Sequence, residues 1–418
     1  MTPAKGFIGV IADDVTGGAS IGAEVARTGH LVDVVRTGQP IRPARSIVLE
    51  TGSRYLAPSL AAQRVHDAAG LLTDACAAVL MKKIDSTLKG NVATELAAFS
   101  AACPGRLLIA PSCPEVGLTL RDGRQFRPGG PGPSVLDLLS PSMAEPLVSL
   151  DLGTVRRGSG EVAKWLRQNP DGPVLADSET EADLATVVAG AADAGIVSFG
   201  GTYGLGAPLA DTFLGSGTAG LFVPPVVDKL LVIAGSASAA TAAQLSYLVA
   251  AGAEEIILDI GRILTGEANG EGERAAARIH SSSASVLIVH TAAARTGEDV
   301  KRHCARLGWN ERDLANFLAV PFSLAVQAAP GHALYFIGGE TTGAVFDVLA
   351  IASLAVRGEC TAAVPFAVCT TTPQWPLIMT KPGAFGSESA LAGAAHTILG
   401  RRSRLHNLPQ EASQPGIR

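Results

Sequence analysis

Short apolar runs alternate along the first part of the chain with longer stretches in which small and apolar residues recur at helical spacing. Buried strands are predicted at 7–12, 31–35, 46–50, 77–83 and 106–112, and helices at 59–75 and 91–103. Strands that alternate with helices usually form a parallel sheet whose two faces are covered. The pattern therefore predicts an α/β fold.

The alternation is interrupted twice. Residues 113–150 are rich in proline and glycine, as in RPGGPGPS at 127–134, and predict either a functional loop or a peripheral hairpin. The pattern then resumes with a strand at 173–178 between helices at 161–168 and 181–195. Periodicity weakens again over 207–229, so we place a domain boundary near residue 225.

A second series of strands begins beyond this boundary. The predicted strands lie at 230–236, 254–260, 285–291, 333–339, 362–368 and 376–381. The sequence thus predicts two α/β domains, each built on a largely parallel sheet flanked by helices. They span 1–225 and 226–400, and a polar tail that we expect to fray follows at 401–418.

The composition narrows the classes of function. Hydrophobic residues make up 47% of the 418 residues and charged residues 17%, which is typical of a globular protein. Aromatic residues make up only 5% and the formal net charge is -5, so a nucleic-acid partner is disfavoured. The six cysteines form no CxxC pair, and no signal-peptide pattern or membrane-spanning run is found. We expect a cytoplasmic protein with no membrane partner.

Polar residues follow several predicted strands of the first domain. The strand ends read Asp13-Asp14, ETGSR (50–54), KKIDSTLKG (82–90) and PSCPE (111–115). Ligands of open parallel sheets bind beyond the carboxyl ends of the strands. Cations there could hold a carboxylate, and hydroxyl and carboxylate groups could hold sugar hydroxyls. The expected substrate-site residues are Asp13, Asp14, Arg54, Lys83, Asp85, Ser86, Thr87 and Lys89.

Helix capping is the alternative interpretation of these residues. Paired aspartates at a strand end are often a helix N-cap with a solvated charge, and DST at 85–87 is also a good capping sequence. Capping explains one strand end. It does not explain cations and acids at four strand ends, so we favour a site for a small anionic polyol.

The second domain carries three turns of small residues. They are AGSASAAT (234–241), GGETTGAV (338–345) and TKPGAFGSES (380–389), and the first two run from a strand into a predicted helix. Exposed N–H groups at such helix starts favour phosphate. The chain has no GxxxxGK[ST] motif and no clean GxGxxG, but three such turns in one domain indicate a nucleotide site.

Six elements resemble the four-carbon acid sugar kinases, an ATP-dependent family once described only as a domain of unknown function. The matching elements, in the family's order, are ADDVTGG (12–18), ETGSR (50–54), KIDSTLKG (83–90), GSASAATAAQ (235–244), GGETTGAV (338–345) and KPGAFG (381–386). The resemblance implies that the first domain binds an acid sugar and the second binds ATP. The implied reaction transfers the γ-phosphoryl group to a hydroxyl of threonate, erythronate or a 3-oxo-tetronate.

The resemblance also implies roles for residues. Asp14 or Asp13 would orient the accepting hydroxyl and take its proton, with Asp85 as a second choice. Arg54, Lys83 and Lys89 would hold the substrate carboxylate and nearby hydroxyls. The residues expected around ATP are Ser236, Ser238, Gly338, Gly339, Glu340, Thr341, Gly383 and Gly386. Mg²⁺ is expected to bridge the ATP phosphates, with no protein ligand assigned.

The sequence departs from the family pattern mostly on the substrate side. Ala19-Ser20 stands where the family often has Asn-Asp, and Leu118 stands where it usually has Arg. Arg121 or Arg124 could replace that cation. Lys89 stands where the family has Arg, and Glu340 stands where it has Asp. The change to lysine keeps the positive charge but loses the two parallel N–H donors with which an arginine binds a carboxylate. These departures leave the identity of the acid sugar open.

Two other functions stay open from the sequence alone. One is a dehydrogenase, which the missing glycine spacing in GSASAAT disfavours. The other is a sugar-acid sensor or an inactive kinase relative, which would bind the acid without releasing ADP. The expected partner is a small-molecule acid sugar, and the oligomeric state is open, with a homodimer as one option.

Overall fold

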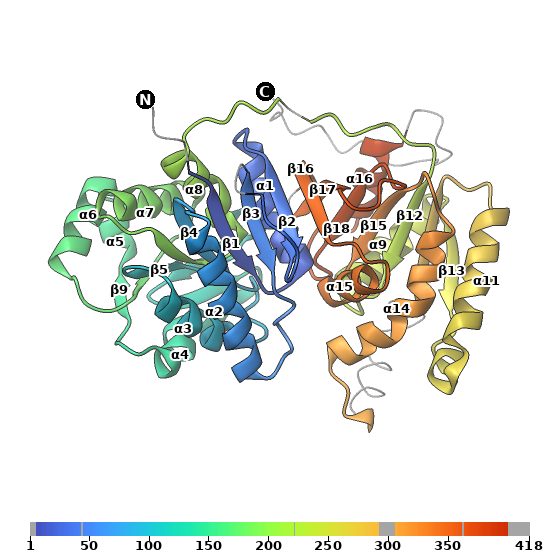
Figure 1. Cartoon of the computed structure of the whole chain (residues 1–418), viewed down its shortest axis with the longest axis horizontal. Coiled ribbons are helices and arrows are strands. Elements are labelled where there is room, and N and C mark those ends of the chain that lie inside the picture. Colours follow the sequence, from blue (N-terminus) through green and yellow to red (C-terminus); the bar gives the residue numbers. More distant parts are fainter. Residues whose placement is uncertain (1–5, 43–44, 221, 292–305, 362, 400–418) are drawn as a thin grey trace. The chain divides into compact units, whose positions relative to one another are not determined.

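The computed structural model describes residues 6–42, 45–220, 222–291, 306–361 and 363–399 (Figure 1). The chain divides into two compact units. The first unit comprises Met1–Val223 and Ala350–Pro373, and the second comprises Pro224–Leu349 and Gln374–Arg418. The predicted polar tail 401–418 lies outside the described residues.

The first unit begins with alternating strands and helices, as predicted. The elements are β1 Ile8–Ala12, α1 Val15–Arg27, β2 Val32–Arg36, β3 Ser46–Glu50, α2 Pro58–Asp74, β4 Val79–Lys83, α3 Val92–Ala102 and β5 Leu107–Ala110. After an interruption they continue as β9 Val148–Leu150, α5 Leu152–Val155, α6 Ser159–Gln168, β10 Val174–Ala176, α7 Glu181–Asp193, β11 Ser198–Gly201, the short helix η3 Tyr203–Leu205 and α8 Gly206–Phe213.

These strands form a parallel sheet in the order β2-β3-β1-β4-β11-β5-β10-β9. Alternate residues of β3 face opposite layers of helices. Ile47 belongs to a core with Val65 and Leu72 of α2, whereas Val48 lies against Gly18 of α1. Burial on both faces explains the continuous apolar runs in these strands.

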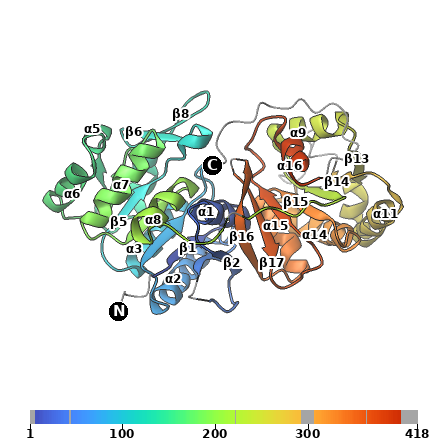
Figure 2. The same ribbon diagram turned by 90° about the horizontal axis from the view of Figure 1, so that it is seen from above.

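The interruption at 113–150 is a small antiparallel sheet with its flanking turns. It contains the short helix η1 Pro114–Val116, strands β6 Thr119–Arg121, β7 Arg124–Arg127 and β8 Gly130–Ser134, then α4 Val135–Leu139 and η2 Ser140–Ser142. Helix α4 packs on β7 and β8, and Figure 2 labels β6 and β8 of this small sheet. The proline and glycine content matches this meander, because it needs turns and a partly exposed edge.

The second unit is a smaller parallel sheet in the order β13-β14-β12-β15-β18. Its elements are β12 Leu230–Ala234, α9 Ala239–Ala250, β13 Glu254–Leu258, α10 Ile260–Arg262, the π-helical turn η4 Ile263–Glu267, α11 Ala268–Ser281, β14 Val286–Thr291, α14 Glu311–Gln327, β15 Ala333–Ile337, α15 Gly339–Val348, β18 Ile378–Lys381 and α16 Ala390–Ile398. Helices α11 and α15 both pack on α14, and α9 packs on α16.

One predicted strand lies in the other unit. The run 362–368, expected in the second domain, falls on β17 Val364–Cys369, which pairs antiparallel with β16 Ser353–Thr361. Strand β16 pairs in turn with β2, with Ser353 opposite Val35 and Val356 opposite Val32. The segment Ala350–Pro373 therefore completes the sheet of the first unit. The hydrophobic pattern of this segment indicates strands but does not indicate which of the two sheets they join.

No helix among the described residues is both long and apolar enough to cross a membrane.

Candidate functional site

The carboxyl ends of three adjacent strands carry the predicted substrate-site residues. In the order β3-β1-β4, Arg54 lies four residues beyond β3, Asp13 and Asp14 follow β1 directly, and Lys83 ends β4. The fourth strand end is not adjacent. Strand β11, which the sequence analysis did not predict, lies between β4 and β5. Its sequence SFGG lacks the β-branched residues that mark a strand.

Arg54 is the centre of this cluster. Its guanidinium donates from Nε to Asp13 Oδ2 at 2.7 Å and from Nη1 to Asp14 Oδ2 at 2.9 Å, and Nη2 lies 3.3 Å from Asp85 Oδ2. Burial disfavours the charge, but the three carboxylates outweigh it and raise the pKa of Arg54. Each guanidinium nitrogen of Arg54 thus contacts a protein carboxylate, a pattern not foreseen from the sequence.

Asp14 also caps helix α1, so the capping interpretation is correct for this residue. Its Oδ1 accepts from the Gly17 N–H at 2.8 Å, and its Oδ2 accepts from the Thr16 hydroxyl at 2.8 Å. Together with the contact to Arg54, these bonds occupy both oxygen atoms. A β-carbon on Gly17 would lie 2.6 Å from Asp14 Oδ1 and 2.9 Å from Lys83 Nζ. The small residue therefore makes room for two charged groups.

Asp13 differs from Asp14 in its free oxygen. Oδ2 bonds Arg54, while Oδ1 is buried and has no hydrogen-bond partner. Burial by itself would raise the pKa of Asp13, but Arg54, Lys82 and Lys83 outweigh it and hold the pKa far below its usual value. Asp13 therefore stays ionised, with one acceptor oxygen unused.

The two lysines at the end of β4 have different roles. Lys82 is fully buried, and its Nζ lies 2.9 Å from Glu95 Oε2. Glu95 also accepts from the Ser53 hydroxyl at 2.5 Å. Lys82 was the alternative to Lys83 in the sequence analysis, which did not single out Glu95, and the buried pair fixes the loop before Arg54. Lys83 donates to the Ile84 carbonyl at 2.7 Å, and burial, partly countered by nearby carboxylates, lowers its pKa.

The loop after β4 carries the predicted Asp85, Ser86, Thr87 and Lys89, and it reaches Arg54 through Asp85. Asp85 Oδ1 accepts from the Thr87 amide at 2.8 Å, from the Thr87 hydroxyl at 2.5 Å and from the Lys89 amide at 3.2 Å. Burial would raise the pKa of Asp85, but Arg54 outweighs it and the pKa is lowered. Ser86 is buried, and the Lys89 side chain is exposed.

Strand β7 contacts this loop through two side chains that the sequence analysis missed. Buried Gln125 donates from Nε2 to the Ser86 carbonyl at 2.9 Å. Arg127 donates from Nη2 to the Thr87 carbonyl at 3.0 Å and from Nε to Gln125 Oε1 at 2.7 Å. Both lie in the proline- and glycine-rich segment, which has no periodicity to indicate where its side chains lie.

The cations proposed to replace the arginine missing at 118 are occupied elsewhere. Arg121 lies 3.3 Å from Glu179 Oε1 and stacks over the ring of Phe126, and exposed Arg124 donates to the Gly132 carbonyl at 2.9 Å. Leu118 is buried. Ser20 is buried as well, and its hydroxyl donates to the Thr16 carbonyl of its own helix at 2.9 Å.

In the second unit, the three predicted turns of small residues meet. Ser238 is the N-cap of α9, where its hydroxyl accepts from the Thr241 amide at 3.1 Å and donates to the Gly383 carbonyl at 2.6 Å. The Gly338 amide donates to the Lys381 carbonyl at 2.9 Å. A β-carbon on Gly383 would collide with the Ser236 side chain. Segments 236–241, 338–342 and 381–386 therefore form one cluster.

The remaining predicted nucleotide residues line the same cluster. Gly338 has φ of 106° and Gly386 has φ of 92°, values that L side chains rarely adopt. Gly339 begins α15, and buried Thr341 lies against Gly235. Glu340 is ion-paired, with its Oε2 3.2 Å from Arg312 Nη1.

Lys381 and Gln244 organise the third turn, and neither was assigned a role from the sequence. Lys381 Nζ donates to the Pro382 carbonyl at 2.9 Å and to the Phe385 carbonyl at 2.7 Å. Gln244 Nε2 lies within 3.1 Å of the carbonyls of Phe385, Gly386 and Ser387. Burial lowers the pKa of Lys381 to about 7. Both residues lie within sequence elements that resemble the family, GSASAATAAQ and KPGAFG, and this position could have indicated a role for them.

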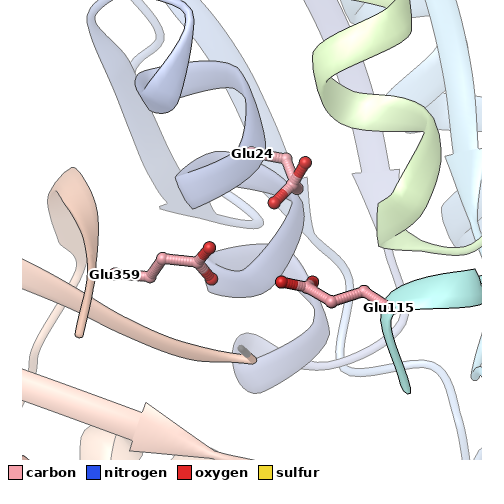
Figure 3. A group of neighbouring side chains, drawn as sticks. All are labelled: Glu24, Glu115 and Glu359. Atoms are coloured by element: carbon pink, nitrogen blue, oxygen red, sulfur yellow. The ribbon is translucent and has the colours of Figure 1, made fainter. Parts of the chain in front are cut away.

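Three glutamates of the first unit form a second charged cluster. Carboxylate oxygens of Glu24, Glu115 and Glu359 all lie within 4.8 Å of one another, and Figure 3 shows the three side chains converging from α1, η1 and β16. Glu24 also pairs with Arg27 at 2.8 Å. Burial, followed by Glu24 and Glu115, raises the pKa of Glu359 to about 8.

Comparisons with known proteins match both halves of the chain. A sugar-binding N-terminal domain matches residues 8–211, and a nucleotide-binding C-terminal domain matches residues 231–391. A D-threonate kinase of Cupriavidus necator is 29% identical over 412 residues, covering 91% of this chain and 95% of the relative. The chain belongs to the four-carbon acid sugar kinase family.

Other members of this acid sugar kinase family show the same breadth of similarity. A 3-oxo-tetronate kinase of Methylobacterium radiotolerans is 28% identical over 422 residues, covering 91% of this chain and 96% of the relative. A solved Salmonella typhimurium protein, described as a putative tRNA synthase, matches with a TM-score of 0.76 and 20% identity. It covers 93% of this chain and 98% of its own, and at this identity it supports the fold alone.

Proposed function

We propose that the protein transfers the γ-phosphoryl group of ATP to a hydroxyl of a four-carbon acid sugar of the threonate, erythronate or 3-oxo-tetronate type. Membership of the acid sugar kinase family supports this activity, and the kinase names of its relatives agree with it. The acid sugar is assigned to the first unit and ATP to the second.

The unpaired Oδ1 of Asp13 is the observation that carries the proposal within the site. A buried carboxylate oxygen without a donor is costly unless a ligand supplies one. A sugar hydroxyl is a suitable donor, and the oxygen of that hydroxyl would then be aimed for attack on the phosphoryl group. The strongly lowered pKa makes Asp13 a weak base. Phosphoryl transfer depends more on positioning and charge neutralisation than on base strength.

Asp14 is assigned a supporting role, because both of its oxygens already accept hydrogen bonds from protein groups. Arg54 would hold Asp13, Asp14 and Asp85 in place against their mutual repulsion. Lys83 would offset charge near the reacting oxygen, and Ser86, Thr87 and Lys89 would contact the remaining substrate groups.

The turns of the second unit fit nucleotide phosphates. Helices α9 and α15 both begin at this cluster, so their N–H groups and dipoles favour an anion there. Ser236, Ser238, Gly338, Gly339, Glu340, Thr341, Gly383 and Gly386 are the proposed ATP-binding residues. Mg²⁺ would be held largely by phosphate oxygens and water, and it would neutralise charge on the phosphates.

The cysteines support the proposed cytoplasmic setting. Cys76, Cys103, Cys113, Cys360 and Cys369 are all free thiols among the described residues. Free cysteines are typical of a reducing compartment.

The test is a comparison of Asp13→Asn with Asp14→Asn, assayed for ADP release with ATP–Mg²⁺ and a panel of four-carbon acids. We expect Asp13→Asn to lower kcat by about 100-fold or more, since general acid–base and orienting groups contribute factors of this size. Asp14→Asn is the matched control, because asparagine also caps helices and keeps a neutral acceptor. Equal activity of Asp13→Asn and wild type on a phosphorylated acid would contradict the role of Asp13.

A further inference from the structure

The charged groups around Arg54 leave no excess positive charge for the substrate carboxylate, and Lys89, which was also expected to hold it, is exposed. Asp13, Asp14 and Asp85 bring three negative charges, and Arg54 and Lys83 bring two positive ones. Lys82 does not change this balance, because Glu95 pairs with it. An acid sugar would add a further negative charge, and adding it to this cluster is unfavourable without another cation.

Arg54 is poorly suited to bind that carboxylate. All of its guanidinium nitrogens contact a protein carboxylate, at 2.7, 2.9 and 3.3 Å. A substrate carboxylate that approached its remaining N–H donors would lie beside three protein carboxylates and be repelled by them. The cation that recognises the acid must therefore come from another element.

Arg127 meets the requirements. It is partly buried on β7, and its two hydrogen bonds go to neutral oxygens, Gln125 Oε1 at 2.7 Å and the Thr87 carbonyl at 3.0 Å. Across the residues that the structure describes, no carboxylate lies within ion-pair distance of it. A guanidinium has five N–H donors, so Arg127 keeps donors for a ligand.

The contacts of Arg127 connect it to the reacting groups. Thr87, whose carbonyl it binds, donates its amide and hydroxyl to Asp85 Oδ1, and Asp85 Oδ2 faces Arg54. Gln125 anchors β7 to the same loop at Ser86. Gly132 on β8 leaves space beside the guanidinium, since a β-carbon there would lie 3.1 Å from Arg127 Nε.

We propose that Arg127 binds the carboxylate of the acid sugar and so makes the enzyme select acids over neutral polyols. This inference rests on the proposed kinase function and deepens it. Arg127 takes the place that was first assigned to Arg54, and its planar fork matches a carboxylate better than the ammonium group of exposed Lys89 does. Its anchoring on β7 makes the small antiparallel sheet part of the substrate site.

The experiment measures kcat/KM for the preferred tetronate and for its carboxamide, which keeps the shape and loses the charge. Wild type should prefer the acid. Arg127→Gln should lower kcat/KM for the acid by about 10- to 100-fold, as expected for a charged hydrogen-bond partner, and should change the value for the carboxamide little. Arg127→Lys should keep part of the preference, because it retains the charge.

Arg124→Gln is the matched control, since Arg124 lies on the same strand and is exposed. It should keep the wild-type preference. An unchanged preference in Arg127→Gln, or its collapse in Lys89→Gln instead, would overturn the assignment. If Arg127→Gln does not fold, the thermal shifts that the acid and the carboxamide produce are measured on Arg127→Lys instead. A difference between the two ligands as large as in wild type would also overturn the assignment of Arg127. Failure of wild type to release ADP with any tetronate would instead refute the kinase function.

Discussion

Gly17 shows how a single missing side chain shapes the substrate cluster. Two acids follow β1 and small residues come next, a pattern that resembles a phosphate loop. The contacts indicate another reason for it. The backbone N–H of Gly17 donates to Asp14 Oδ1, and the space that a side chain of residue 17 would fill is occupied by Asp14 Oδ1 and Lys83 Nζ. Charged groups of opposite sign can thus approach the same helix turn.

Gly17→Ala should therefore lower activity while leaving the fold intact. A β-carbon 2.6 Å from Asp14 Oδ1 must displace Asp14 or Lys83, and a shift of about 1 Å at a reacting group costs about 100-fold in rate. The measurement is kcat/KM with the preferred tetronate. Gly70→Ala in α2 is the control, because nothing lies within 4 Å of its β-carbon and alanine favours helix by about 1 kcal/mol. Wild-type kcat/KM in Gly17→Ala would show that the contact is easily relaxed.

At the scale of elements, the three glutamates of Figure 3 place like charges between α1, η1 and β16. Glu359 meets Glu24 from α1 and Glu115 from η1, with Arg27 as the nearby cation and the Ala363 amide as a donor. Burial also raises the pKa values of Glu115 and Glu181, and Glu181 accepts from the Glu115 amide at 3.1 Å. These groups bind protons more tightly when the protein is folded.

The folded protein should accordingly lose stability as the pH rises from about 5 to about 8. In this range Glu359 is protonated in the folded state, where its pKa is about 8, and ionised in the unfolded state, whose pKa is near 4.5. Glu359→Gln removes this penalty, so its free energy of unfolding in urea should exceed that of wild type at pH 8.5 and match it more closely at pH 5.5. Glu161→Gln is the control, because the Glu161 side chain is partly exposed. A difference that does not grow with pH would contradict the raised pKa.

The sequence predicted most elements of the parallel sheets, because strands buried on both faces leave continuous apolar runs. It also predicted which residues follow β1, β3 and β4. It could not predict the partners of Arg54 and Arg127, because pairing depends on the order of strands and on a meander without periodicity. Strand β11 was missed because its sequence SFGG contains two glycines, which are rare in strands. Gly200 is needed there because its missing side chain leaves room for Leu96.

At the scale of the whole chain, the boundary between the units is crossed more than once. The sequence analysis expected a division near residue 225, and the first crossing falls between Val223 and Pro224. The chain returns to the first unit for Ala350–Pro373, which the prediction of a continuous domain at 226–400 did not include. Strand β16 packs on α1, where a β-carbon on Gly22 would lie 3.1 Å from Val356 Cγ2. The stability of the first unit therefore depends on residues far along the chain.

Val356→Ala tests this dependence. Removing two buried methyl groups should cost about 2 kcal/mol, and the loss should fall on the first unit. Hydrogen exchange read by mass spectrometry should show faster exchange in α1 and β2, with β12 and β14 unchanged. Val289→Ala, at a fully buried position in β14, is the matched control and should give the reverse pattern. Faster exchange confined to β12–β15 in Val356→Ala would mean that β16 supports the second unit instead.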